Sequence, residues 1–221
     1  MSAPTPDQVA EITARYGLGR DPRLVGAPAR GELGQVWRLE TSTGTWAVKS
    51  PFDPEPEEQA QSSACFQEAA VAAGVPAPAV VRTRDERVLL DLDGGQFRVY
   101  SWVDIQPLDV ALDPEAVGTL LASIHRLERP APGPVHPWYT EPVGAETWDR
   151  LVDELLRAGL PRGEYFAAFR EELVALERLL AEPARLQHLH LDLWADHVRA
   201  TRAGGLWVLD WDNAGAGDPG Q

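Results

Sequence analysis

Two aspartates near the C-terminal end carry the strongest chemical signal in this sequence. Asp192 follows His190 in the sequence H-L-D, and Asp210 follows the apolar segment 206–209. Residues 198–201 and 206–209 are β-prone and flank a Gly-Gly turn, so they predict a β-hairpin. Because a hairpin brings its two ends together, we expect both carboxylates at one edge of a small sheet. That arrangement suits a divalent cation and a base for an attacking hydroxyl, which are the needs of phosphoryl transfer.

A second signal is Lys49, the only lysine in the chain. It ends the alternating sequence T-W-A-V-K, which predicts a strand. A lysine in this position is typical of the V-A-I-K strand of kinases, where the ammonium holds the α- and β-phosphates of ATP. The alternative is a solvated lysine at a sheet edge. Because every other cationic side chain is an arginine, the sequence favours the functional interpretation.

The order and separation of these motifs resemble those of the aminoglycoside phosphotransferase and choline kinase-like enzymes, which have the protein-kinase-like fold. In that family a catalytic loop H-G-D-x-x-x-x-N precedes I-D-W and then G-D-P. Here H-L-D occupies residues 190–192, L-D-W occupies 209–211 and G-D-P occupies 217–219. The resemblance implies that Asp192 is the catalytic base or hydroxyl-orienting group, and that Asp210 is the principal Mg²⁺ ligand.

Two residues depart from the family pattern. Leu191 replaces the family's glycine, and His197 replaces its metal-binding asparagine. Asparagine offers Mg²⁺ a carbonyl oxygen, whereas an imidazole nitrogen suits softer metals such as Mn²⁺ or Zn²⁺. We therefore expect His197 as a second ligand that weakens the site, shifts the metal preference or marks a degraded enzyme. Asp196 is an alternative oxygen donor.

The other histidines of this region are not expected to bind metal. By resemblance, His190 props the catalytic loop, and His188 is expected at the surface of a strand or loop. A zinc site is not expected, because the chain has one cysteine and its histidines lack the spacing of zinc enzymes.

Two further sets of residues are expected to contact the nucleotide. Gly31 and Gly34 lie in a predicted strand–turn–strand, where glycine lets backbone N–H groups approach phosphates closely. An ordinary hairpin turn is the alternative. By resemblance, the segment after the strand that ends at Tyr100 links two lobes, and the backbone groups of Ser101 and Val103 read the edge of adenine.

The expected partner of Lys49 lies on a helix predicted at residues 57–73. Glycine and proline directly after this segment are helix stop signals. The family has an acidic residue upstream of G-V-P, and Glu68 holds that place by resemblance. Glu57 and Glu58 are rivals, and an exposed helix glutamate is the alternative.

We expect an α+β chain with a protein-kinase-like two-lobe fold. Residues 1–103 should form the N-terminal lobe, an antiparallel sheet with one helix that binds the nucleotide phosphates. Residues 104–221 should form an incomplete, mainly helical C-terminal lobe with the catalytic β-hairpin, since family members continue through several more helices. Periodic apolar residues predict further helices at 7–16, 114–127, 145–158 and 163–181.

Composition narrows the classes of function. The chain has 221 residues, of which 44% are hydrophobic, and this is enough for a substantial core. A net charge of −14 argues against nucleic-acid binding. The single cysteine allows no disulfide within the chain and fits a reducing cytoplasm. No apolar run reaches the length of a membrane span, so a membrane partner is not expected.

The residues and the resemblance together predict an ATP-dependent phosphotransferase that moves the γ-phosphate to a hydroxyl of a small molecule, aminoglycoside-like or other. ATP and Mg²⁺, with Mn²⁺ as an alternative metal, are the expected cofactors. A nucleotide-binding relative without turnover, inactive or truncated, is the alternative. An interaction domain with no ligand is a third hypothesis. The sequence names neither the acceptor nor the oligomeric state.

Overall fold

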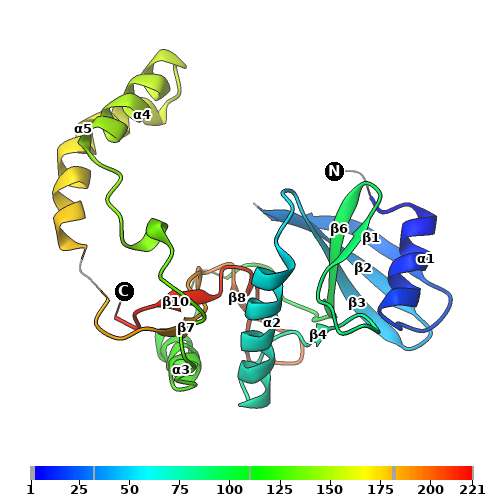
Figure 1. Cartoon of the computed structure of the whole chain (residues 1–221). Coiled ribbons are helices and arrows are strands. Elements are labelled where there is room, and N and C mark those ends of the chain that lie inside the picture. Colours follow the sequence, from blue (N-terminus) through cyan, green and yellow to red (C-terminus); the bar gives the residue numbers. More distant parts are fainter. Residues whose placement is uncertain (1–2, 32, 110, 181–182, 221) are drawn as a thin grey trace.

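The structure, a computed structural model, consists of two lobes with different architectures (Figure 1). It describes residues 3–31, 33–109, 111–180 and 183–220. The described residues up to Ser101 form the sheet lobe, and those from Pro114 onward form the helical lobe. None of the described helices combines the length and the apolar character that a membrane span requires.

A six-stranded antiparallel sheet forms the frame of the sheet lobe. Its strands are β1 (Arg23–Arg30), β2 (Gly34–Thr41), β3 (Gly44–Pro51), β4 (Val80–Val81), β5 (Leu90–Leu92) and β6 (Gly95–Ser101). The strand order is β1-β2-β3-β6-β4, and β5 pairs with β6. Leu39, Val48 and Val99 are buried on one face, as the alternation of a strand with one covered face requires. Lys49 is paired with Arg98 across β3 and β6, so two cations meet at the centre of this sheet.

Helix α1 (Pro6–Arg15) covers that apolar face. Thr5 caps the helix, because its side chain accepts from the Gln8 N–H and the Gln8 side chain accepts from the Thr5 N–H. Ile12 and Tyr16 pack into the core of the sheet. The α1 helix therefore closes the far side of the sheet and leaves the opposite face to the site.

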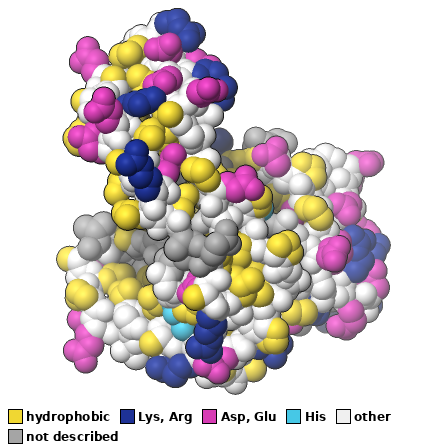
Figure 2. Space-filling model, turned by 60° about the vertical axis from the view of Figure 1, so that its left-hand side comes forward, with side chains coloured by type: hydrophobic (Ala, Val, Ile, Leu, Met, Phe, Trp, Pro, Cys, Tyr) yellow, Lys and Arg dark blue, Asp and Glu magenta, His cyan; other side chains and the backbone are white. Residues whose placement is uncertain are grey.

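In the described part of the helical lobe there are three long helices and two small sheets. Its helices are α3 (Pro114–His125), α4 (Ala145–Arg157) and α5 (Arg162–Leu176), with 3₁₀ turns η1 (Pro137–Tyr139) and η2 (Glu177–Leu179). Strands β7 (Gln187–Leu189) and β10 (Gly215–Gly217) form one sheet, and β8 (Val198–Ala200) and β9 (Leu206–Val208) form the predicted hairpin. Helices α4 and α5 pack on each other and project from the rest of the chain (Figure 1), and Figure 2 shows hydrophobic side chains on their surface.

Helix α2 (Glu57–Ala72) joins the two lobes through a shared core. Phe66 on α2 lies against Trp211 with ring centroids 5.6 Å apart, and it stacks on His188 at 4.2 Å. Ile124 of α3 and Val208 of β9 belong to the same buried cluster. The segment that carries Asp210 is thus packed directly against a helix of the sheet lobe.

The predicted elements agree with the structure except at a few places. The short strand β10 was not predicted, because its Gly-Ala-Gly sequence has no strand signal. The expectation of a surface position for His188 is wrong: it is 8% exposed, because β7 is covered by Phe66 of α2. The helix predicted over 163–181 is shorter in the structure: α5 ends at Leu176, a 3₁₀ turn follows to Leu179, and residue 181 lies outside the described residues.

Candidate nucleotide and metal site

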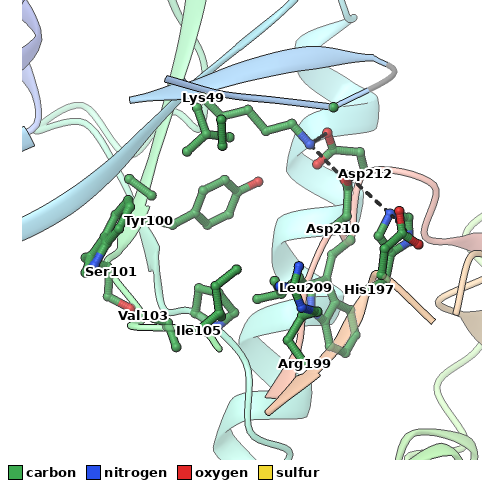
Figure 3. Close-up of a pocket in the computed structure, with 18 of the residues that line it drawn as sticks. Lys49, Tyr100, Ser101, Val103, Ile105, His197, Arg199, Leu209, Asp210 and Asp212 are labelled. Carbon is green, nitrogen blue, oxygen red and sulfur yellow. Dashed lines mark hydrogen bonds and ion pairs between the residues drawn. The ribbon is translucent and has the colours of Figure 1, made fainter. Parts of the chain in front are cut away.

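Lys49 and Asp210 meet where the two lobes face each other (Figure 3). Lys49 Nζ lies 2.8 Å from Asp210 Oδ1 and 2.6 Å from Asp212 Oδ2. Burial lowers the pKa of Lys49, but the carboxylates of Asp212 and Asp210 outweigh burial and raise the pKa above its ordinary value. Burial likewise raises the pKa of Asp210, and the Lys49 ammonium outweighs it and holds that pKa below its usual range. The site therefore contains one permanent cation between two carboxylates.

Asp212 is a member of this site that the sequence analysis missed. Its Oδ1 lies 2.9 Å from Nη1 of Arg98, a side chain that is only 2% exposed. Arg98 also pairs with Glu55 and donates a hydrogen bond to the Tyr100 hydroxyl at 3.2 Å. A second aspartate two residues after Asp210, in L-D-W-D, was the only sequence signal for it.

Asp192 lies close to the same groups through the loop after β7. Asn213 Nδ2 donates to Asp192 Oδ2 at 2.8 Å. His197 Nδ1 donates to the Asp192 carbonyl oxygen at 2.6 Å and lies 3.5 Å from Asp192 Oδ2, while its Nε2 lies 3.8 Å from Asp210 Oδ2. His197 thus stands between the two predicted aspartates, and the hairpin brings them to one edge as the sequence predicts.

His190 connects the two segments that carry these aspartates. Its Nε2 donates to the Leu209 carbonyl at 3.1 Å, and its Nδ1 accepts from the Asp192 N–H at 3.3 Å. Burial lowers the pKa of His190 to about 4, so the ring is neutral at neutral pH. A neutral ring is what these contacts require, because one nitrogen donates and the other accepts.

Two residues of the site, one in the loop after β7 and one after β9, have backbone dihedral angles in the left-handed region. Leu191 has φ of 63° and Asp210 has φ of 55°. For a residue with a Cβ this region costs on the order of 1 kcal/mol or more. The Leu191 side chain packs over Gly215 and Gly217, where a Cβ on Gly217 would come within 2.6 Å of Leu191 Cδ2. Leucine in place of the family's glycine is therefore accommodated by two glycines of β10.

A cavity of about 320 Å³ opens beside Lys49, between the lobes (Figure 3). The residues that the sequence predicts and that line it are Gly31, Lys49, Ser101, Val103, Asp196, His197 and Asp210. The lining residues that were not predicted include Gln67 on α2, Tyr100 on β6, Arg199 on β8 and Asp212. Arg199 Nη2 donates to the Gln106 carbonyl at 2.5 Å, which holds the guanidinium on the helical-lobe wall of the cavity.

Three predicted residues have other contacts than expected. The pair of Lys49 with Glu68 is not formed, because Glu68 makes a two-pronged contact with Arg82 at 2.7 and 2.9 Å. Gly34 is needed for packing, since a Cβ there would lie 2.7 Å from the Ser50 carbonyl oxygen. The Ser101 N–H donates to the Ala79 carbonyl at 2.9 Å, so this amide cannot also read a base.

The donor atoms near Asp210 fit a cation that is held together with a bound phosphate. Among the residues that the structure describes, no set of three or more His, Cys, Asp or Glu side chains is placed to hold a metal ion. Mg²⁺ in nucleotide sites is usually held by one or two protein groups, with phosphate oxygens and water completing the octahedron. Asp210 supplies the carboxylate. The Nδ1 of His197 is committed to the Asp192 carbonyl oxygen, so Nε2, which lies 3.8 Å from Asp210 Oδ2, is the ring nitrogen left to bind a cation.

Comparisons with known proteins agree with this geometry. Residues 25–221 match the sequence profile of the "Phosphotransferase enzyme family". No curated protein sequence matches the chain. Similar solved structures include spectinomycin phosphotransferase in complex with ADP and spectinomycin, with 11% identity, a TM-score of 0.61, and coverage of 96% of this chain and 70% of that one. Amicoumacin kinase in complex with AMP-PNP and Ca²⁺ gives 15% identity, a TM-score of 0.64, and coverage of 98% and 67%.

Choline kinase LicA from Streptococcus pneumoniae gives 18% identity, a TM-score of 0.56, and coverage of 96% of this chain and 69% of that one. At such identities the likeness concerns the fold, which is the two-lobe, kinase-like fold of small-molecule kinases. The family match covers most of the chain and includes every residue of the Lys49–Asp210 site. The chain therefore belongs to the phosphotransferase enzyme family.

Proposed function

We propose that this protein binds ATP with a divalent cation and transfers the γ-phosphate to a hydroxyl group of a small molecule. The observation that carries the proposal is the contact of 2.8 Å between Lys49 Nζ and Asp210 Oδ1 at the wall of an interlobe cavity. An ammonium and a metal-binding carboxylate at one point are what a magnesium triphosphate requires. The alternating strand, the hairpin and the loop that position them come from segments far apart in the chain.

The cavity supports the placement of the nucleotide. Ala47 on β3 and Leu209 line it from opposite lobes and offer two apolar surfaces for a base. The Val103 backbone lies at the edge of this space (Figure 3) and is the proposed contact for the base. Gly31 and Lys49, on the sheet side, would then contact the phosphates.

The cation would be held by Asp210 and by His197 Nε2. When bound, it would neutralise the charge that develops on the transferred phosphate. The imidazole makes Mn²⁺ a better candidate here than in a site with asparagine. Lys49, which pairs with Asp210 in the structure, would share its charge with the phosphates.

Asp192 is the group proposed to orient the acceptor hydroxyl and accept its proton. The Asn213 amide holds one of its oxygens at 2.8 Å, which fixes the direction of the carboxylate. His197 Nδ1 holds the loop from the other side by its bond to the Asp192 carbonyl. A carboxylate that is held by one hydrogen bond, on a backbone that is held by another, is well placed for general-base catalysis, because its orientation is set before the reaction.

The acceptor is proposed to be a hydroxyl-bearing small molecule, and the chain's charge of −14 favours a cationic one. A panel of aminoglycosides, amino alcohols, macrolides and sugars, incubated with γ-labelled ATP and Mg²⁺ or Mn²⁺, tests this directly. Transfer of label to one class of acceptor supports the proposal. Nucleotide binding without transfer or hydrolysis would favour the inactive relative, whose motivation is His197 at the metal site.

A further inference from the structure

We propose that Asp212, fixed by Arg98, is the positioning residue of Lys49 and takes the role that the sequence pattern assigns to Glu68. The inference rests on the proposed function, because Lys49 is positioned for the phosphates of a nucleotide. It differs from the sequence-based expectation in placing the anchor of the lysine in the helical lobe instead of on helix α2.

The first argument is the geometry of the ammonium. Lys49 Nζ lies 2.6 Å from Asp212 Oδ2, closer than the 2.8 Å to Asp210 Oδ1. The side chains of Lys49 and Asp212 are 11% and 13% exposed, so solvent screens their attraction little. Glu68, in contrast, is 37% exposed and paired with Arg82. The only carboxylates within ion-pair distance of Lys49 among the described residues are therefore those of the helical lobe.

The second argument is that Asp212 cannot easily leave Lys49. Its other oxygen, Oδ1, faces Arg98 Nη1 at 2.9 Å. Arg98 is itself fixed by Glu55 and by the Tyr100 hydroxyl, and it neighbours Lys49 across β3 and β6. A carboxylate shared by two buried cations keeps its direction, because turning away from either one would leave that cation unpaired.

The third argument concerns the division of labour between the two aspartates. Asp210 is the proposed ligand of the cation, so its contact with Lys49 is weakened when a metal–nucleotide binds. Asp212 has its second oxygen on Arg98 and remains available to Lys49. Trp211 between them is 2% exposed, with its ring against Phe66 and His190, so the two carboxylates keep a constant separation. Lys49 is thus held in position for the phosphates only while the helical lobe, which carries Asp212, is packed against the sheet lobe.

The test uses the fact that Lys49 is the only lysine in the chain. Full-length protein labelled with ¹⁵N only at lysine gives one side-chain ammonium signal, which reports the surroundings of Lys49. We compare wild type with Asp212→Asn, and with Glu68→Gln as the matched control that removes the charge of the helix carboxylate. Calorimetry with Mg²⁺·ADP, and kcat and KM for Mg²⁺·ATP hydrolysis, complete the measurements.

In Asp212→Asn we expect the lysine signal to move and kcat to fall roughly 10- to 100-fold, since a charge-assisted contact is lost. The affinity for Mg²⁺·ADP should change less, because the lost orientation is offset by the removal of a negative charge near the phosphates. Glu68→Gln should leave all three readouts at wild-type values. Asp212→Glu, which restores the charge, should recover part of kcat.

An unmoved lysine signal in folded Asp212→Asn, or an equal movement in Glu68→Gln, would overturn the assignment. A loss confined to the affinity for Mg²⁺ would place Asp212 on the cation and would also overturn it. If Asp212→Asn does not fold, Asp212→Glu provides the test. A Lys49 signal at the position of a solvent-exposed lysine would argue against the contact. A Lys49 signal shifted away from that position would support it. The wild-type protein could transfer no phosphate while its lysine signal still changes in Asp212→Asn. That result would contradict the proposed function but would support the contact between Lys49 and Asp212.

Discussion

The Nε2–H of His190 donates to the carbonyl oxygen of Leu209 at 3.1 Å, and this bond joins the Asp192 loop to the residue that precedes Asp210. The ring also accepts from the Asp192 N–H through Nδ1. One neutral imidazole therefore sets the distance between the two segments that carry the proposed catalytic and metal-binding carboxylates.

The stability of the fold should depend on pH through His190. Its folded pKa is about 4, below the unfolded value of about 6.5, so the unfolded state binds more protons between these values. The contribution of His190 is complete above about pH 6.5 and is lost as the pH falls toward 4, by up to about 3 kcal/mol. Urea unfolding of wild type and His190→Asn at about pH 7.5 and about pH 5 measures it. Equal pH slopes in the two proteins would contradict this account.

Leu191 and Gly217 should be energetically coupled. A Cβ at position 217 would lie 2.6 Å from Leu191 Cδ2, so Gly217→Ala should lower the free energy of unfolding by about 1–3 kcal/mol. In a Leu191→Gly background the same change should cost clearly less, because the clashing atom is gone and φ of 63° suits glycine. A double-mutant cycle of urea midpoints gives the coupling. If the effects of the two substitutions on the free energy of unfolding are additive, the Leu191 side chain moves away from position 217 without a loss of stability.

Replacing Asp192 by Asn should reduce kcat by about 10²- to 10⁴-fold and leave the affinity for Mg²⁺·ATP nearly unchanged. The amide keeps the shape of the side chain but cannot accept a proton. Asp153→Asn is the matched control, because Asp153 is exposed on α4 and does not line the cavity. Steady-state kinetics with the acceptor found in the panel, together with calorimetry, check both variants. Full turnover in Asp192→Asn would rule out the proposed role.

His197→Asn should shift the metal preference toward Mg²⁺. An amide oxygen is a harder donor than an imidazole nitrogen, so the ratio of apparent Mg²⁺ to Mn²⁺ affinity should rise by about tenfold. The measurement is nucleotide-dependent thermal stabilisation across a series of metal concentrations. His136, exposed and far along the chain, offers the control variant His136→Asn. An unchanged ratio would mean that His197 acts only by bracing the Asp192 carbonyl.

Elements with strong local signals could be predicted from the sequence. Helix α2 lies within the predicted limits because Gly-Val-Pro ends it, and the β8–β9 hairpin forms because Gly204 and Gly205 adopt positive φ between two apolar segments. The order of the motifs was also enough to identify Lys49 and Asp210 as members of one site, although they stand 161 residues apart.

The partner of Lys49 depends on how the two lobes pack against each other. Glu68 lies on the correct helix, but Arg82 is within its reach and neutralises it, and no local pattern in the sequence predicts a contact between these positions. Asp212 reaches Lys49 because β3 and β6 place two cations side by side, and because Trp211 is buried against α2. Ion pairs depend on where long side chains end in space, and local propensities act only on neighbours in the chain. The sequence therefore specified which groups are present, and the packing of the two lobes specified which charges meet.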